Sequence, residues 1–431
     1  MQFHRICILG LGYIGLPTAC MFASQGIHVV GVDINSDVLE QLSQGKIHIH
    51  EPGLAEFFHE NVVKGTITFS NKPEPAAAFI IAVPTPFYGD KKADLTAVKA
   101  AAESIVPVLA KNNLVVLEST SPPETTAKIV APILEKSGLK AGQDFHLVYS
   151  PERVLPGKIL QELVHNDRVI GGITAASAEQ GKALYSTFVK GQIFLTDAVT
   201  AEMVKLMENT YRDVNIALAN EFSRLAERFG VDAWEVIKIA NHHPRVSILN
   251  PGPGVGGHCI SVDPWFLVEA APDITPLIKT ARQVNDSQPE FVVETVKQAI
   301  GSPHGKHIAL LGLAYKPNVD DFRESPSMEI ARLLEVSGAS VTCFDPYLQK
   351  PLNLVHTVSN LAEAICDCDA IILAVAHQEL LAIDPHAAAG LTSSRLAVDL
   401  VNGWPDESWK DAGFHLARLG DGKNKRQAGA Q

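Results

Sequence analysis

Short runs of apolar residues recur through the first 150 positions, and each is followed by glycine or polar residues. None of these runs alternates between apolar and polar side chains, which is typical of strands buried on both faces of a parallel sheet. A helix-like stretch at 16–24 separates the first two runs. The pattern predicts an α/β domain with strands within the segments 6–10, 28–33, 78–86, 114–120 and 145–152.

The middle of the chain has a different pattern. Residues 200–229 place apolar side chains at helical spacing without a proline, and Gly230 follows as a candidate C-cap. This stretch is too long for an ordinary crossover helix, so it predicts a long central helix between domains. A second helical stretch and a glycine-rich loop around Cys259 come next.

The C-terminal part repeats the form of the N-terminal part. HIALLGLAYKP (307–317) echoes RICILGLGYIG (5–15), with Ala314 in place of one glycine, and each second strand ends in an aspartate, Asp33 or Asp345. The predicted fold is therefore α/β, with two Rossmann-like doubly wound domains joined by a long central helix. The expected boundaries are 1–198, 199–300, 301–420 and a disordered polar tail at 421–431.

Composition narrows the choice of partners. The 431 residues are 46% hydrophobic and 19% charged, and the net charge of −12 argues against a nucleic-acid-binding protein. No basic-then-apolar leader or long apolar run indicates a membrane span. Six cysteines without regular spacing suggest a reducing cytoplasm, and no second pair accompanies Cys366 and Cys368 to form a metal site.

The first turn carries a dinucleotide fingerprint. Gly10, Gly12 and Gly15 lie between a predicted strand and a predicted helix, which suits a tight turn and a close approach of a pyrophosphate to the helix N-terminus. Asp33 ends the second strand, where a carboxylate accepts hydrogen bonds from ribose hydroxyls and repels the extra phosphate of NADP. The cofactor prediction is NAD.

Cys259 lies in NPGPGVGGHCISVDPWF (250–266), a segment in which glycines let a ligand come close to the thiol. A thiolate beside a nicotinamide suggests oxidation of an aldehyde through a thiohemiacetal and a thioester. Such chemistry needs a group that lowers the thiol pKa, an oxyanion partner and a carboxylate for the final water.

Several polar residues suit those roles. Lys205 and Asn209 lie one turn apart on the predicted long helix, Asp263 follows the cysteine, and Glu152 and Thr120 each follow a predicted buried strand. Each also has an ordinary interpretation, as a solvated lysine, a turn aspartate, a surface ion pair or a helix cap.

The ordered set of motifs is similar to that of the UDP-glucose/GDP-mannose dehydrogenase family. GLGYIGLPTA, SPERVLPG, AEMVKLMENTYRDVNIALANE, PGPGVGGHCISVDPWF and GLAYKPNVDDFRESP carry the resemblance from residue 5 to about 405. Within the family the sequence most resembles the branch that oxidises UDP-N-acetyl-D-mannosamine. Enzymes for UDP-glucose typically have a lysine where this chain has Val262, which argues against UDP-glucose.

The resemblance implies a role for each matching position. Cys259 matches the nucleophile, Lys205 the oxyanion-stabilising lysine, Asn209 and Asp263 the residues that hold water and orient the lysine, and Glu152 the acid of thioester hydrolysis. Thr120 matches a threonine near the reacting carbon. The positions that match cofactor contacts are Gly10, Gly12, Tyr13, Ile14, Gly15, Asp33, Thr85, Thr120 and Arg323. Besides Lys205 and Asn209, the positions that match sugar-nucleotide contacts are Arg153, Val154, Arg212, His243, Arg245, Gly256, Tyr315 and Lys316.

The implied function is a cytoplasmic, NAD-dependent oxidation of the sugar C6 of UDP-N-acetyl-D-mannosamine to the uronate, for a surface polysaccharide. The resemblance also implies a homo-oligomer, a dimer or larger. Three alternatives stay open: the same oxidation of UDP-N-acetyl-D-glucosamine, a two-electron hydroxyacid dehydrogenase that needs no cysteine, and a catalytically idle sensor of nucleotide sugars.

Overall fold

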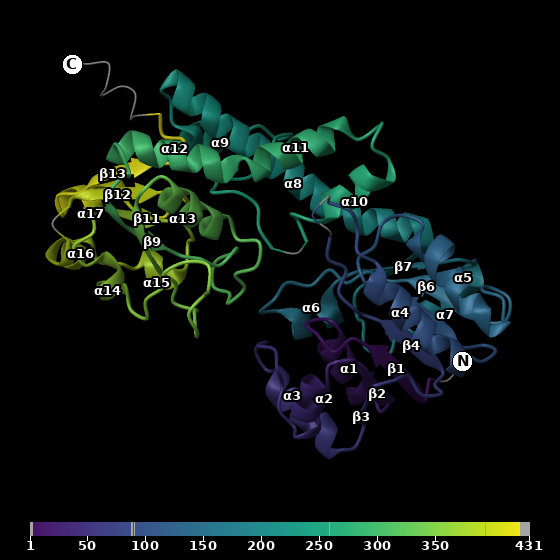
Figure 1. Ribbon diagram of the computed structural model, residues 1–431. Coiled ribbons are helices and arrows are strands. Elements are labelled where there is room, and N and C mark those ends of the chain that lie inside the picture. The colour runs from purple at the N-terminus through teal and green to yellow at the C-terminus, as the bar shows by residue number, and fades with distance from the viewer. Residues whose placement is uncertain (1–2, 88, 90, 258, 393, 423–431) are drawn as a thin grey trace. The chain divides into compact units, whose positions relative to one another are not determined.

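The computed structural model describes residues 3–87, 89, 91–257, 259–392 and 394–422. The chain divides into two compact units (Figure 1). The first unit comprises Met1–Glu208 and Trp265–Pro272, and the second comprises Asn209–Pro264 and Asp273–Gln431. The tail predicted to be disordered lies outside the described residues from position 423 onward.

Among its described residues, the first unit contains an eight-stranded sheet in the order β3-β2-β1-β4-β5-β6-β7-β8. Neighbouring strands pair in parallel from β3 to β6 and again between β7 and β8, whereas β6 and β7 are antiparallel. The strands are β1 (Arg5–Leu9), β2 (His28–Val32), β3 (Ile67–Ser70), β4 (Ala78–Ile81), β5 (Leu114–Leu117), β6 (His146–Tyr149), β7 (Arg168–Gly172) and β8 (Ile193–Asp197).

Helices cover both faces of this sheet because successive strand residues point to opposite sides. Ile6 and Ile8 enter one core, and Cys7 and Leu9 enter the other. The first core is covered by α1 (Gly15–Ser24), α3 (Leu54–Val63), α6 (Ile159–His165) and α7 (Ala175–Tyr185). The second is covered by α4 (Thr96–Ile105), η2 (Thr126–Val130), α5 (Ala131–Leu134) and the start of α8 (Ala198–Phe229). The remaining helices are α2 (Ser36–Ser43), η1 (Val106–Val108) and η3 (Glu135–Ser137).

The register of the parallel strands fixes where their loops emerge. Leu9 pairs with Ile81, Ile81 with Leu117, and Leu117 with Tyr149. The carboxyl ends of β1, β4, β5 and β6 therefore lie at one edge of the sheet, where open α/β sheets bind ligands. Four of the segments predicted to carry site residues begin at this edge.

In the described part of the second unit, five parallel strands form a sheet in the order β10-β9-β11-β12-β13. Its helices again cover two cores, with α12 and α13 over one and α14 to α17 over the other. The strands are β9 (His307–Leu311), β10 (Ser340–Phe344), β11 (Ala370–Leu373), β12 (Leu396–Asp399) and β13 (His415–Arg418). The helices that follow α8 are α9 (Ala233–Ala240), α10 (Asp263–Ala270), α11 (Pro276–Asp286), α12 (Gln288–Ile300), α13 (Pro326–Val336), α14 (Leu361–Ile365), α15 (Gln378–Leu381), α16 (Pro385–Leu391) and α17 (Asp406–Asp411).

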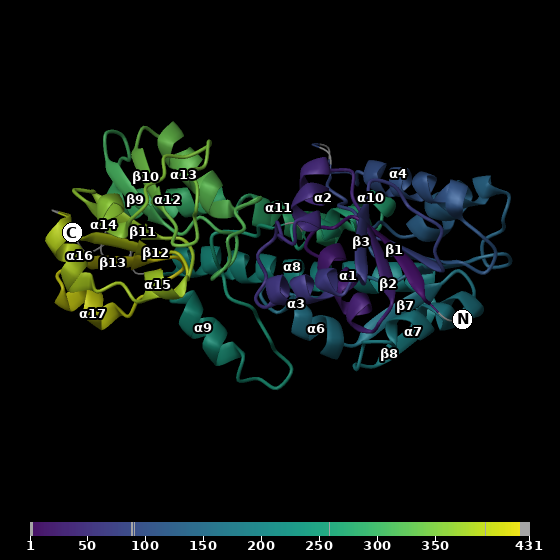
Figure 2. The same cartoon turned by 90° about the horizontal axis from the view of Figure 1, so that it is seen from below.

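The predicted fold class is confirmed: two α/β domains with largely parallel sheets are present, together with the long helix α8 (Figure 2). The expected boundaries at 198, 300 and 420 stay a prediction. Within the part of the chain that the structure describes, no helix has an apolar stretch sufficient to cross a membrane.

A buried ion pair joins α8 to α11 within the second unit. The guanidinium of Arg282 donates to Asp213 and Asp286, and the side chains of Arg282 and Asp213 are 1% and 0% exposed. The Asn285 amide also donates to the Asp213 carboxylate at 2.8 Å. Burial raises the pKa of Asp213, and Arg282 opposes that rise. The carboxylate thus depends on its partners to remain charged in the interior.

We therefore expect Arg282→Met to lower the free energy of unfolding by about 3–5 kcal/mol, because it leaves the Asp213 carboxylate buried without its cation. The measurement is urea denaturation at neutral pH. Asp213→Leu combined with Arg282→Met should recover much of that loss, since it removes the isolated charge. Equal destabilisation of the single and double variants would contradict this account.

Candidate active site

The glycine turn between β1 and α1 is closed by contacts that exclude side chains. Gly10 has φ +91°, and a Cβ there would lie 2.6 Å from the Ala82 carbonyl oxygen. A Cβ at Gly15 would lie 1.8 Å from the Gly10 oxygen. At Gly12, by contrast, a Cβ would meet no atom within 4 Å. Gly10 and Gly15 are therefore required by the fold, whereas Gly12 faces space that suits a diphosphate at the start of α1.

Asp33 follows β2 beside this turn. Its Oδ2 accepts the backbone N–H of Leu11 at 2.9 Å, and its Oδ1 accepts that of Asn35 at 2.9 Å. The residue is half-buried, and each oxygen retains acceptor capacity beyond its backbone donor, which suits a ribose hydroxyl. The other half-buried residues expected at the cofactor in this unit are Tyr13, Ile14, Thr85 and Thr120. The residues present fit a dinucleotide, which supplies a hydride acceptor when bound.

Two of the predicted catalytic residues meet within the first unit. Lys205, on α8, donates through Nζ to the backbone oxygen of Glu152 at 3.0 Å, and it is only 8% exposed. Glu152 follows β6, and its Oε1 accepts the backbone N–H of Arg153 at 2.7 Å. Its Oε2 accepts a bond from Arg168. The carboxylate is thereby held in one orientation.

Three further predicted residues meet within the second unit. The Asn209 amide, on α8, donates to Asp263 Oδ2 at 2.6 Å, and Asp263 is 2% exposed. The Asp263 backbone N–H donates to the Cys259 oxygen at 2.8 Å, one turn before α10 begins. The Cys259 residue is exposed. Within the single helix α8, Lys205 and Asn209 lie one turn apart, as predicted.

The glycine loop before the cysteine packs against a second loop of the same unit. A Cβ at Gly256 would lie 2.4 Å from the Glu324 oxygen, and one at Gly257 would lie 2.8 Å from the Tyr315 ring. The Gly257 N–H also donates to the Arg323 oxygen at 3.3 Å. These glycines thus let the cysteine loop and the 315–324 loop approach each other. The predicted site positions Gly256, Tyr315 and Arg323 lie at this contact.

The remaining predicted contacts are more scattered. Arg153 donates to Glu208 Oε1 at 2.6 Å and to the Asp167 backbone oxygen, and neither acceptor was anticipated from the sequence. The Arg323 guanidinium forms two bonds to Asp321, at 2.8 and 2.7 Å. Val154 packs against the first core, Lys316 is half-buried, and Arg212, His243 and Arg245 are exposed. Among the described residues, no three or more His, Cys, Asp or Glu side chains are grouped to hold a metal ion.

The second unit also has a buried counterpart of Asp33. Asp345, after β10, accepts backbone N–H bonds from Leu313 at 2.7 Å and Ala314 at 3.0 Å, and one from His377 Nε2 at 3.0 Å. Although burial opposes its charge, the bond from His377 and the backbone donors lower the pKa of Asp345. Asp345 is 2% exposed, so its carboxylate stabilises the turn after β9 by accepting the N–H groups of that turn.

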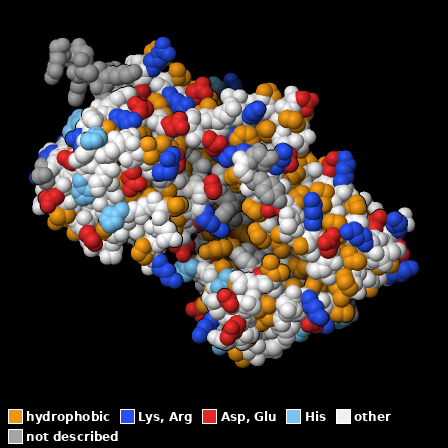
Figure 3. All heavy atoms as spheres, viewed as in Figure 1, with side chains coloured by type: hydrophobic (Ala, Val, Ile, Leu, Met, Phe, Trp, Pro, Cys, Tyr) orange, Lys and Arg blue, Asp and Glu red, His pale blue; other side chains and the backbone are white. Residues whose placement is uncertain are grey.

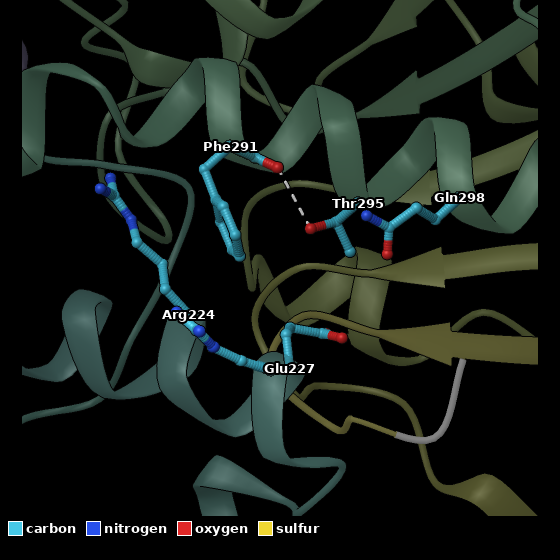
Figure 4. A pocket seen from close by; sticks show the side chains of 6 residues that line it. Arg224, Glu227, Phe291, Thr295 and Gln298 are labelled. Carbon is cyan, nitrogen blue, oxygen red and sulfur yellow. Dashed lines mark hydrogen bonds between the residues drawn. The ribbon is translucent and has the colours of Figure 1, made fainter. Parts of the chain in front are cut away.

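A small pocket lies elsewhere in the second unit (Figure 4). It has a volume of about 230 Å³ and is lined by Arg224, Glu227, Arg228, Phe291, Thr295 and Gln298. Arg224 is tied to Gln288, Ser287 and the Val284 oxygen. Thr295 donates to the Phe291 oxygen at 3.1 Å (Figure 4). None of the residues that line the pocket is a predicted site residue. The bonds of Arg224 join α8 to the α11–α12 segment.

Sequence reasoning missed the buried acids and the arginine that support the site. Glu51 accepts the backbone N–H groups of Gly157 and Ile159, each at 2.7 Å, and so holds the end of the 150–157 loop. Arg168 forms buried ion pairs with both Glu152 and Glu118. A charged residue at the end of an apolar strand, as in LVVLEST, was the available signal, but it does not reveal the partner.

An open α/β sheet with a fitted glycine turn and an acidic strand end is typical of an NAD-dependent dehydrogenase. Comparison with known proteins gives the family. Models of the UDP-glucose/GDP-mannose dehydrogenase family match over nearly the whole chain: the NAD-binding domain at 4–189, the central domain at 199–287 and the UDP-binding domain at 309–406. The chain belongs to this family, and it is an NAD-dependent UDP-sugar dehydrogenase.

Individual relatives are similar along their whole length. A UDP-N-acetyl-D-mannosamine dehydrogenase of Methanocaldococcus jannaschii is 48% identical over 426 residues, with 97% of each chain covered. An NDP-N-acetyl-D-galactosaminuronic acid dehydrogenase of Ralstonia solanacearum is 45% identical, with 94% of this chain and 97% of that protein covered. The solved structure of a UDP-D-ManNAc dehydrogenase from Pyrococcus horikoshii is 41% identical, with a TM-score of 0.90 and coverage of 97% and 100%.

The contrast between the glycines gives a test of the cofactor site. Gly12→Val should leave the midpoint of thermal unfolding nearly unchanged, because its side chain meets no protein atom, yet weaken NAD binding by about tenfold or more. Titration calorimetry with NAD measures the affinity. Gly15→Val is the matched comparison, and it should unfold at a clearly lower temperature because of its contact with the Gly10 oxygen. Unchanged NAD affinity in a folded Gly12→Val protein would contradict the assignment.

Proposed function

We propose that the protein oxidises C6 of UDP-N-acetyl-D-mannosamine to the carboxylate in two successive hydride transfers, with Cys259 as a covalent nucleophile. The observation that carries this proposal is the exposed Cys259 one turn before Asp263, whose carboxylate is bonded to Asn209. A dehydrogenase that stops at the aldehyde needs no nucleophilic thiol. The overall reaction consumes one water and two NAD and releases the uronate, two NADH and three protons.

The roles of the side chains follow from their chemistry. Lys205 stabilises the alkoxide and takes up or returns its proton, since an ammonium suits a developing oxyanion. Cys259 attacks the aldehyde, and the resulting hemithioacetal loses the second hydride to give a thioester. Asn209 and Asp263 hold the reacting water and orient the lysine. Glu152 accepts a proton from the water that cleaves the thioester.

The identity of the sugar rests on the relatives. Two of those compared above are named for UDP-N-acetyl-D-mannosamine, and a third, of nearly the same identity, is named for an N-acetyl-galactosaminuronic acid. All three names point to an N-acetylated hexose rather than glucose, in agreement with Val262. UDP-N-acetyl-D-glucosamine is the alternative substrate, because it differs from the proposed one only in configuration at C2.

The first test is stoichiometric. With UDP-N-acetyl-D-mannosamine in limiting amount, we expect two NADH per sugar nucleotide consumed, and the uronate as the product identified by mass spectrometry. A ratio near one with released aldehyde would contradict the thioester step. UDP-N-acetyl-D-glucosamine, UDP-N-acetyl-D-galactosamine and UDP-glucose serve as comparison substrates, and the highest kcat/KM identifies the preferred sugar. In the same assay, Cys259→Ser should lower acid formation on the order of 10³-fold or more.

We also propose that the protein works as a homo-oligomer in the cytoplasm. Tyr211, Leu218, Leu225 and Phe229 are spaced seven, seven and four residues apart on α8, so they share one face, and their exposed fractions range from 43% to 72%. An apolar helix stripe of this kind favours burial against a second helix. A second copy of the same helix is a self-complementary partner under two-fold symmetry.

If so, Leu218→Asp should shift the protein toward the monomer, because a carboxylate would then be buried in the contact. Sedimentation equilibrium or light scattering measures the mass. Lys238→Gln, on the separate helix α9, lowers the net charge by the same one unit as Leu218→Asp and should leave the mass unchanged. A wild-type protein that is monomeric at micromolar concentration would refute the proposed assembly.

A further inference from the structure

The first unit buries a connected group of ionisable side chains that includes Glu152. Four elements contribute to it: Glu118 follows β5, Glu152 follows β6, Arg168 begins β7, and Tyr185 ends α7. The side chains of Glu118, Arg168 and Glu152 are 1%, 4% and 8% exposed. The group lies at the sheet edge from which the site loops emerge, because β5 and β6 end in register.

One guanidinium connects the two acids. Arg168 donates through one terminal nitrogen to Glu152 Oε2. Through the other it donates to Ser150 Oγ at 3.1 Å and reaches Glu118 Oε1 at 3.5 Å. The Tyr185 hydroxyl donates to the same Glu118 oxygen, and the guanidinium lies over the Tyr185 ring at 4.2 Å. Arg168 therefore has one orientation, fixed from two sides.

The charges of this group do not cancel when both carboxylates are ionised. Two carboxylates share one guanidinium in a site with almost no solvent. Burial raises the pKa of Glu118 to about 7, and Glu152 adds to the rise, while Arg168 and Tyr185 oppose it. Burial works against the cation too, but the acids and Tyr185 raise the pKa of Arg168. Apolar residues of similar size would stabilise the fold at least as well, so the cluster calls for a functional explanation.

We propose that Arg168 and Glu118 are positioning residues for Glu152: Arg168 holds the carboxylate in its reactive orientation, and Glu118 draws part of the guanidinium charge away from it. The proposal rests on the proposed function, in which Glu152 is the base of thioester hydrolysis. A base bound to an undivided cation would hold a proton weakly. Sharing the cation between two acids keeps Glu152 fixed without committing the whole guanidinium to it.

The geometry leaves Glu152 able to act. Among the described residues, each carboxylate oxygen has one donor, the Arg153 N–H on Oε1 and Arg168 on Oε2, so each retains acceptor capacity for a water. In hydrolysis the water oxygen bonds to the acyl carbon, the carbon–sulfur bond breaks, and the thiolate of Cys259 leaves. One water proton passes to Glu152 and then to the thiolate, and the second leaves with the uronic acid group to solvent. No oxidant enters this step.

The test separates hydride transfer from hydrolysis. The full-length protein is mixed with NAD and UDP-N-acetyl-D-mannosamine in a stopped-flow instrument, and quenched samples are analysed for intact mass. In Glu118→Gln and Arg168→Lys we expect a rapid burst of two NADH per active site at the wild-type rate. A steady-state kcat lowered about tenfold or more should follow, with little change in KM and an acyl adduct accumulating on Cys259.

A pH profile distinguishes charge sharing from a purely structural effect. The charged or titratable groups around the Glu152 residue are Glu118, Arg168, Tyr185, Arg153 and Lys205, from β5, β7, α7, the 150–157 loop and α8. Glu118→Gln keeps the shape and the acceptor oxygen but gives Glu152 the whole guanidinium. The apparent pKa of the ascending limb of adduct hydrolysis should therefore shift downward. A merely structural role would lower the rate without moving that limb.

Glu202→Gln is the matched control, because Glu202 is an equally buried acid of the same unit whose partners are Thr126 and the Glu124 N–H. It should show no adduct accumulation, whatever its stability. Wild-type hydrolysis rates in both Glu118→Gln and Arg168→Lys, with folding verified by circular dichroism, would overturn the positioning proposal alone. A wild-type enzyme that forms NADH but never an adduct or acid would overturn the proposed function, and this inference with it.

Discussion

The parallel register of β1, β4, β5 and β6 is the constraint on which the site depends. Since Leu9, Ile81, Leu117 and Tyr149 pair across the sheet, the next residue of each strand emerges at the same edge. The glycine turn, the loop before Thr85, Glu118 with Thr120, and the loop that carries Glu152 all begin there. Short side chains at the edge are as important as the strands, because Gly10 closes against the Ala82 oxygen.

The same edge explains how an acidic protein can hold anionic ligands. The protein has a net charge of −12, but acidic side chains do not cluster on the face seen in Figure 3. Basic and acidic side chains are intermingled there. The local positive potential comes instead from the N-terminus of α1, which follows the glycine turn. Exposed charges more than about 10 Å from this helix terminus are largely screened by salt, so the overall charge has little influence there.

Much of this arrangement was predictable from the sequence, and the reasons for the rest are physical. Unbroken apolar runs and the glycine fingerprint predicted both sheets, and helical spacing predicted α8 with Lys205 and Asn209 on one face. The antiparallel turn from β6 to β7 was not predicted, because strand order depends on tertiary packing. The pairing of Arg168 with Glu118 and Glu152 joins positions 50 and 16 residues apart, and no local pattern encodes such contacts. The Arg153–Glu208 bond was missed for the same reason.

The buried state of Asp345 has a consequence for stoichiometry. Its carboxylate already receives donors from Leu313, Ala314 and His377 on one oxygen and from Tyr347 on the other, so it cannot turn toward a ribose without leaving interior N–H groups unmatched. Of the two aspartates that follow the second strand of each sheet, Asp33 is the one placed to bind a dinucleotide. Under the proposed four-electron reaction, the pocket beside Asp33 would be filled, emptied and refilled for each sugar, so exchange of spent cofactor would fall within every catalytic cycle.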